Sequence, residues 1–290
     1  MRSPHIPVLL REVLHVFEGI KIKTFFEGTL GAGGHAKAIM DAHPEIERYV
    51  GCDRDPKALA LAKEVLAPWG EKVELIHGSY ADVAKILDEL GIDGIDGFLI
   101  DIGVSSMQLD ERERGFSFMG DAPLDMRMDP DGKLTAEEIV NRYPEKELAR
   151  IFFEYGEERR SRQVAKAIAE ARRKKKIQTT KQLVDVIRPV ATRGRLHPAT
   201  LVFQALRIAV NDELGQLEKG LKAATEKLNP DGRIAVISFH SLEDRIVKNR
   251  FRDEKEKLKV ITKKPVGPDL EEIKMNPRSR SAKLRAAERI

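Results

Sequence analysis

The first third of the chain alternates between short apolar runs and stretches in which apolar residues recur every three or four positions. The spaced stretches, at 35–43, 55–70 and 80–91, are typical of amphipathic helices. The continuous runs are typical of buried strands: TFFEG (24–28), RYVGCD (48–53), VELIHG (73–78) and GFLIDIG (97–103). Strand–helix alternation with strands of this kind predicts a parallel sheet that helices cover on both faces.

The pattern changes after Ile102. A loop-like segment, 105–133, is followed by helical spacing at 134–143, 145–156, 162–176, 180–192 and 201–228, the last being one long helix or two. Thr135 and either Thr179 or Thr180 are expected to cap two of these helices.

A further apolar strand is expected at 232–240, and the tail is expected to supply one or two last strands. The simplest topology returns the strand at 232–240 to the first sheet. The sequence therefore predicts a doubly wound, mostly parallel α/β domain formed by 1–112 and 206–290, interrupted by an all-helical insertion at 113–205. We expect the insertion to recognise substrate.

Composition narrows the class of protein. Hydrophobic residues make up 41% of the chain, so a packed core is expected and general disorder is not. The net charge of +4 only weakly suggests a polyanionic partner. The single cysteine, Cys52, excludes an internal disulfide and a cysteine-based zinc knuckle. Neither a signal peptide nor a membrane-spanning run is seen, so we expect a soluble, cytoplasmic protein without a membrane partner.

A glycine cluster, EGTLGAGGHA, lies between the first predicted strand and the first predicted helix. Ligands bind open α/β sheets at this edge, outside the carboxyl ends of the strands. The segment from Gly31 to Ala36 fits the dinucleotide pattern G-x-G-x-x-A, and Asp53 follows about twenty residues later. The cluster by itself is therefore compatible with an NAD-dependent oxidoreductase, although no hydride-transfer constellation is identified.

Three acids favour a different ligand. Glu27, Asp53 and Asp101 end the first, second and fourth predicted strands. Carboxylates suit the sulfonium, the ammonium and the ribose of S-adenosylmethionine better than they suit a pyrophosphate. The alternative is that Asp53 and Asp101 merely cap the helices that follow. For His35 we favour a backbone contact with ligand, the ring being incidental, and Tyr80 is expected either to stack on adenine or to pack in the core.

Long motifs spread from residue 5 to the C-terminus resemble those of the bacterial MraW (RsmH) family. They are HIPVLLREVL, EGTLGAGGHA, DIGVSSMQLD, RGFSF, PLDMRMD, HPAT, FQALRIAVNDEL, ISFHSLEDRIVK and NPRSRSAKLRAAER. The resemblance implies a class I methyltransferase (Rossmann-like) fold with an inserted helical domain. It also implies methyl transfer from S-adenosylmethionine to the exocyclic N4 of a cytidine in the decoding region of 16S ribosomal RNA, in the small ribosomal subunit, with no DNA partner.

The resemblance also carries cofactor positions onto this chain, which are Gly33, Gly34, His35, Asp53, Tyr80, Asp101 and Gln108. We assign Asp101 a catalytic role as a hypothesis, and we assign no metal ligands. Two positions depart from the family pattern: Met107 stands where proline is expected, and Leu201 stands where arginine is expected.

Basic runs are candidates for RNA contacts: ARRKKK (171–176), ATRGRLHP (191–198) and NPRSRSAKLR (276–285). The run at 171–176 is equally well a solvated helix end. Asp125, Arg127 and His240 are expected to contact substrate or to form an internal ion network. A non-enzymatic RNA-binding protein is a further alternative. An eroded glycine loop or missing acids would favour it, but the glycine loop and the acids are both intact.

Overall fold

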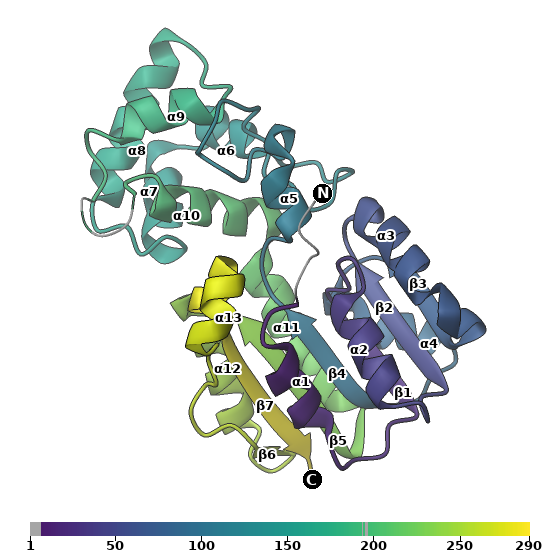
Figure 1. The fold of residues 1–290 in the computed structure, drawn as a ribbon. Coiled ribbons are helices and arrows are strands. Elements are labelled where there is room, and N and C mark those ends of the chain that lie inside the picture. The colour runs from purple at the N-terminus through teal and green to yellow at the C-terminus, as the bar shows by residue number, and fades with distance from the viewer. Residues whose placement is uncertain (1–6, 193, 195–196) are drawn as a thin grey trace. The chain divides into compact units, whose positions relative to one another are not determined.

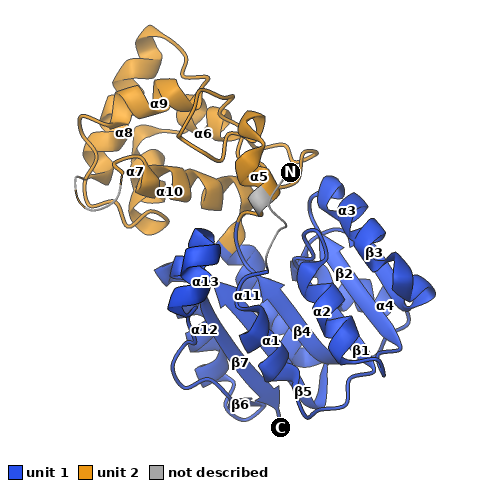
Figure 2. Cartoon of the chain, in the orientation of Figure 1, with its two compact units in different colours: residues 1–103, 214–290 blue, residues 104–213 orange. Residues whose placement is uncertain are grey.

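The structure, a computed structural model, describes residues 7–192, 194 and 197–290. The chain forms two compact units, residues 1–103 with 214–290 (unit 1) and residues 104–213 (unit 2), which Figure 2 shows in blue and orange. His5 of the first family motif and Arg193 and Arg195 of the run at 191–198 lie outside the described residues.

Unit 1 is built on one sheet whose strand order is β3-β2-β1-β4-β5-β7-β6. The pairings from β3 to β5 are parallel, and β7 runs antiparallel to both of its neighbours (Figure 1). The strands are β1 (Thr24–Glu27), β2 (Arg48–Asp53), β3 (Val73–His77), β4 (Ile95–Asp101), β5 (Leu228–Ser238), β6 (Leu258–Val260) and β7 (Lys283–Arg289). The predicted sheet, the return of the strand after the insertion and two last strands in the tail are confirmed.

Helices cover both faces of this sheet, as continuously apolar strands require. Alternate residues of each strand enter two separate cores. Phe25 of β1 packs with helices α1, α2 and α3, and Phe26 packs with α4, α11 and α12. These helices are α1 (Leu10–Phe17), α2 (Gly34–Ala42), α3 (Pro56–Leu66), α4 (Val83–Glu89), α11 (Glu213–Lys227) and α12 (Ser241–Asp253).

The order of the strands reverses between β1 and β4, because the chain passes from β1 outward to β2 and β3 and then returns to the other side of β1. The loops after β1 and β4 therefore leave the same edge of the sheet in neighbouring positions. This switch point is where open α/β sheets hold their ligands.

Unit 2 is helical and has its own core, in which Leu148, Phe152, Ile168 and Val202 are completely or almost completely buried. Its helices are α5 (Ser106–Asp110), α6 (Ala136–Arg142), α7 (Glu145–Glu154), α8 (Ser161–Lys174), α9 (Thr180–Ile187) and α10 (Thr200–Asn211). Thr135 and Thr179 cap α6 and α9 through their side chains, as predicted.

The helical unit is longer at both ends than the predicted insertion, 113–205. Val104 and Leu109 pack against the helical core, so the unit begins directly after β4. At the other end the buried Asn211 side chain accepts a hydrogen bond from the Met128 amide and donates one to the Met126 carbonyl, both at 2.8 Å. These long-range contacts hold all of α10 in unit 2.

The predicted helical stretch 201–228 divides into α10 and α11 at Asp212, which has φ of 50° and ends α10 in the left-handed conformation. No helix within the described ranges combines the length and the apolar character that a membrane span needs.

Candidate active site

The glycine loop after β1 is fastened to both neighbouring strands by backbone hydrogen bonds. The Gly28 amide donates to the Leu99 carbonyl of β4 at 2.8 Å, and the Leu30 amide donates to the Cys52 carbonyl of β2 at 3.0 Å. The Gly31 amide donates to Oδ2 of Asp53 at 2.8 Å. The ends of β1, β2 and β4 therefore meet in one hydrogen-bonded corner.

Two glycines of this loop need a backbone conformation that other residues rarely adopt, since φ is 54° at Gly31 and 80° at Gly33. Gly34 is needed for space: a Cβ atom there would lie 2.6 Å from Cγ of Pro7. The segment before α1 thus packs directly on the loop.

The ring of His35, which was expected to be incidental to ligand binding, has a structural role. It is buried, and its Nε2 lies 2.9 Å from the Val8 carbonyl oxygen, a hydrogen bond that ties the segment before α1 to the loop. The His35 amide stands in the first turn of α2.

Asp53 organises the loop rather than capping the next helix. Its Oδ1 accepts from the Asp55 amide and its Oδ2 accepts from the Gly31 amide, each at 2.8 Å. The N-cap of α3 is Asp55, whose side chain accepts from the Lys57 amide. Burial raises the pKa of the Asp53 carboxyl, and the backbone donors only partly offset that rise.

Asp101 ends β4 with its backbone fixed and a side-chain oxygen unused. Its amide donates to Oγ1 of Thr29 at 2.6 Å, while the buried Oδ1 has no hydrogen-bond partner among the described residues. Burial, with smaller contributions from the charges of Glu243 and Glu272, raises the pKa of Asp101 to about 8. An unpartnered buried oxygen on a carboxyl that titrates near neutrality is typical of a functional group.

Glu27 lies deeper than the sequence alone indicated. It is fully buried, its Oε2 accepts from the Tyr49 hydroxyl at 2.6 Å, and its buried Oε1 has no partner within the described part of the chain. Burial raises the pKa of Glu27 well above its ordinary value, and the charges of Asp101 and Asp53 raise it further. Three carboxyl groups therefore share one corner, and a cation bound there would favour their ionised forms.

Tyr80 packs in the core of unit 1, since only 7% of the residue is exposed. A Cβ atom on Gly28 would lie 2.4 Å from Cβ of Tyr80, and one on Gly220 would lie 2.6 Å from the ring. The tyrosine thus fills a space that two glycines leave. Stacking on adenine stays a prediction.

Gln108 stands in unit 2, in the first turn of α5. It forms a capping box with Ser105: the Gln108 amide donates to Oγ of Ser105 at 3.2 Å, and Oε1 of Gln108 accepts from the Ser105 amide at 3.1 Å. The side chain is buried and shapes the turn that follows β4.

The chain belongs to the MraW methylase family. The model of that family matches residues 2–290. A relative from Heliobacterium mobile, named ribosomal RNA small subunit methyltransferase H, is 49% identical over 312 residues, covering 100% of each chain. A relative of the same name from Geotalea uraniireducens is 50% identical over 307 residues, covering 99% of this chain and 98% of the other.

Among solved structures, a protein from Clostridium thermocellum is similar with a TM-score of 0.50 over 98% of this chain and 99% of that chain, at 13% identity. At that identity the likeness bears on the fold alone, which is the class I methyltransferase fold that the sequence predicted. The family resemblance in the sequence is confirmed.

The enzyme is a methyltransferase whose cofactor is S-adenosylmethionine. The corner at the ends of β1, β2 and β4 fits this cofactor, because one buried oxygen of Glu27 and one of Asp101 have no hydrogen-bond partner among the described residues. A pyrophosphate would meet the same oxygens unfavourably, and this weighs against the dinucleotide alternative.

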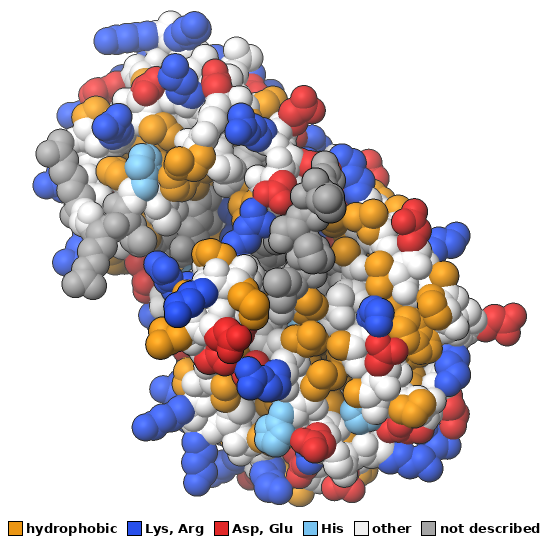
Figure 3. Space-filling model, in the orientation of Figure 1, with side chains coloured by type: hydrophobic (Ala, Val, Ile, Leu, Met, Phe, Trp, Pro, Cys, Tyr) orange, Lys and Arg blue, Asp and Glu red, His pale blue; other side chains and the backbone are white. Residues whose placement is uncertain are grey.

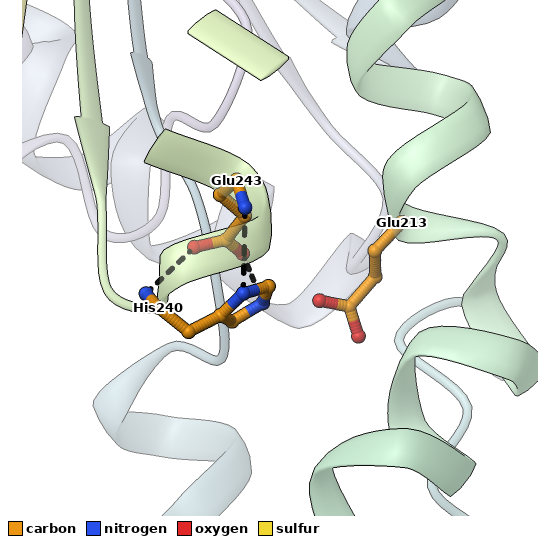
Figure 4. Close-up of side chains that lie close together, drawn as sticks. All are labelled: Glu213, His240 and Glu243. Atoms are coloured by element: carbon orange, nitrogen blue, oxygen red, sulfur yellow. Dashed lines mark hydrogen bonds and ion pairs between the residues drawn. The ribbon is translucent and has the colours of Figure 1, made fainter. Parts of the chain in front are cut away.

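Other residues of the family motifs hold the fold together. A capping box joins His240 and Glu243 at the start of α12: the Glu243 amide donates to Nδ1 of His240 at 3.4 Å, and the His240 amide donates to Oε2 of Glu243 at 3.2 Å (Figure 4). Nε2 of His240 also lies 2.9 Å from Oε1 of Glu243. Figure 4 also labels Glu213, whose carboxylate receives two hydrogen bonds from Arg207, both at 2.8 Å. An internal network was one of the two expectations for His240, and a substrate contact was the other.

In unit 2, Arg127 holds both carboxylate oxygens of Asp125, at 2.9 and 2.7 Å. This pairing lowers the pKa of the Asp125 carboxyl. Asp125 and Arg127 therefore form the internal ion pair that was the alternative to a substrate contact.

The basic runs are divided between structural and exposed cations. Arg172 donates to the carbonyls of Val140 and Tyr143 at 2.7 Å, closing the end of α6. Arg285 is buried against Asp244, with Nε 2.6 Å from Oδ1. Exposed cations remain at Arg173, Lys174, Lys175, Arg278 and Arg280. Sequence alone did not distinguish these two groups.

Proposed function

We propose that this methyltransferase transfers the methyl group of S-adenosylmethionine to the exocyclic N4 of a cytidine in the decoding region of 16S ribosomal RNA, within the small ribosomal subunit. The relatives' shared name supports a small-subunit RNA substrate. The observation that carries the choice of an amino group is the carboxyl of Asp101, with one buried oxygen still unpartnered among the described residues.

Asp101 has the chemistry needed to assist methyl transfer to the N4 amino group of cytosine. The lone pair of a cytosine amino group is delocalised into the ring, so the nitrogen is a poor nucleophile. A hydrogen-bond acceptor that binds an N4 hydrogen localises the lone pair on nitrogen. It also stabilises the positive charge that develops on nitrogen as the new bond forms. Oδ1 of Asp101 is available for this bond, and its raised pKa makes the carboxylate a better base than an exposed aspartate.

S-adenosylmethionine, when bound, supplies the methyl group on a sulfonium. We assign its binding to Gly33, Gly34, His35, Asp53, Tyr80, Asp101 and Gln108. The glycine loop leads into the start of α2, and its conformation is maintained by Asp53 and by the His35 ring. Asp53 is the candidate for the ribose, since an ionised carboxylate accepts from both hydroxyls.

The helical unit is the candidate for substrate recognition, because it presents the exposed cations at the end of α8. A base must leave its stack to reach an enzyme's acceptor site, so unpaired or splayed RNA is the expected form of substrate. A ribosomal RNA substrate implies action in the cytoplasm, and no DNA partner is proposed.

The test uses labelled S-adenosylmethionine, the purified protein and small ribosomal subunits that lack the modification. After incubation the RNA is digested to nucleosides, and label on N4-methylcytidine is the expected result. Label on another nucleoside, or none at all despite cofactor binding by calorimetry, would overturn the substrate assignment while leaving the methyltransferase fold in place.

A further inference from the structure

A second feature of unit 1 adjoins the same corner of the sheet: helix α13 (Leu270–Met275) and the 3₁₀ turn that follows it, Pro277–Ser281. Oε1 of Glu272 in α13 accepts a hydrogen bond from the Leu9 amide at 2.9 Å. Arg11 pairs with Asp269, the N-cap of α13, at 3.1 Å. These contacts fasten α13 to the segment just before and at the start of α1.

That same segment lies on the glycine loop, through Val8 and His35 and through Pro7 and Gly34. The charge of Glu272 also contributes to the raised pKa of Asp101, which places α13 within electrostatic range of the β4 end. Segments from both ends of the chain thus border the candidate active site.

Large apolar side chains of this segment are exposed, which is unusual for a helix that packs beside a sheet. Leu270 is 78% exposed and Met275 is 62% exposed. Lys274 and Arg280 are exposed beside them. Figure 3 shows hydrophobic, basic and acidic side chains over the position of α13, and Glu271 of this helix is exposed. Two of the acids here, Asp269 and Glu272, are already occupied by the contacts to residues 9–11.

We propose that this surface, residues 270–281, holds the RNA strand next to the target cytidine. The proposal rests on the proposed function and names the part of unit 1 that receives the substrate. Exposed cations neutralise phosphates, and apolar side chains cover the faces of bases that have left their stack. The segment that α13 contacts also packs on the glycine loop, so a strand held on this surface lies near the edge of the sheet that its cytidine must reach.

The first variant, Lys274→Glu/Arg280→Glu, tests the phosphate contacts. Its control is Lys255→Glu/Lys257→Glu, an equal change of charge at exposed positions after α12. Binding to unmodified small subunits is measured over a range of salt concentrations, and cofactor affinity is measured by calorimetry. The slope of log K against log salt is expected to fall by about 1.4 for two lost contacts to single-stranded RNA, with at least a tenfold loss of affinity.

The second variant, Leu270→Ser/Met275→Ser, tests the base contacts. An approximately tenfold loss of subunit affinity is expected from the loss of packing on one base. The control is Leu61→Ser/Val65→Ser on α3, whose side chains are 42% and 37% exposed. Cofactor affinity equal to that of the wild type shows that each variant is folded. If a double variant does not fold, the single variant Arg280→Gln is used in its place.

Subunit affinity and salt slope equal to those of the controls would overturn the proposal. So would a change of oligomeric state in light scattering with unchanged RNA affinity, since the surface would then bind a second copy. Failure of the proposed function is recognised separately, because the wild-type protein would then place no label on N4-methylcytidine.

Discussion

The raised pKa of Asp101 predicts that affinity for S-adenosylmethionine depends on pH. A cation beside a carboxylate favours the ionised form, so the bound cofactor lowers this pKa and the ionised protein binds it more tightly. With a pKa of about 8 in the free protein, Asp101 is about 1% ionised at pH 6 and half ionised at pH 8. Affinity should therefore rise up to about 50-fold between these pH values.

The assay is isothermal titration calorimetry at several pH values, with Asp101→Asn as the matched variant. The asparagine amide cannot titrate, so the cofactor affinity of this variant should change much less with pH. Comparing the variant with the wild type cancels the effect of the cofactor's own titration. Measured at pH 7 in two buffers of different ionisation enthalpy, the wild type should release up to about 0.9 proton per cofactor bound. S-adenosylhomocysteine, which lacks the sulfonium charge, should show a weaker dependence.

The same shift has a consequence for stability. The unfolded carboxyl ionises near its ordinary value of 3.8, whereas the folded one holds its proton until about 8. Between these values the folded state binds the extra proton, so this group lowers the free energy of unfolding as pH rises. Asp101→Asn should thus be more stable than wild type at pH 8, by about 2–3 kcal/mol after allowance for partial solvation.

Equal pH dependence of cofactor binding in the wild type and in Asp101→Asn would refute the reasoning. It would mean that another group, Glu27 or Asp53, carries the linked proton. A wild-type affinity that falls between pH 6 and pH 8 would contradict the predicted sign directly.

Three further variants test neighbouring parts of the site. Asp101→Ala should abolish methyl transfer to RNA with cofactor binding retained at pH 6, and near-normal turnover would refute its catalytic role. Gly34→Ala should weaken cofactor binding about tenfold or more in calorimetry, because the new Cβ lies 2.6 Å from Cγ of Pro7; unchanged affinity would show that the segment moves freely. Tyr49→Phe should lower the free energy of unfolding by about 1–3 kcal/mol in a denaturant titration, because it leaves Glu27 without its donor at 2.6 Å. A change within error would mean that Glu27 finds another partner.

Much of the fold followed from local pattern. The strands at 24–27, 48–53 and 73–77 lie where continuous apolar runs predicted them. Thr135 and Thr179 cap the helices that their spacing indicated. These features are set by neighbouring residues, through side-chain periodicity and through a hydroxyl that reaches an amide three positions away. The glycine loop and the acids at the strand ends could be identified from the sequence because they too depend on neighbouring residues.

The partners of those acids were decided only by tertiary structure. Asp53 binds Gly31, 22 residues away, and Tyr49 binds Glu27 at the same separation. His35 reaches Val8, and Glu272 reaches Leu9 across 263 residues. Each contact depends on strand register or on helix placement, which no local window of sequence contains.

The sequence by itself thus determined the doubly wound sheet, the family, and the set of acids and glycines at one edge. It did not determine which charges are free to act. Arg172 and Arg285 belong to basic runs that the sequence made candidates for RNA contacts, yet both form hydrogen bonds with partners inside the protein. Burial and pairing of a charged side chain depend on packing between distant segments, so only the folded chain separates the cations that hold the fold from those that face solvent.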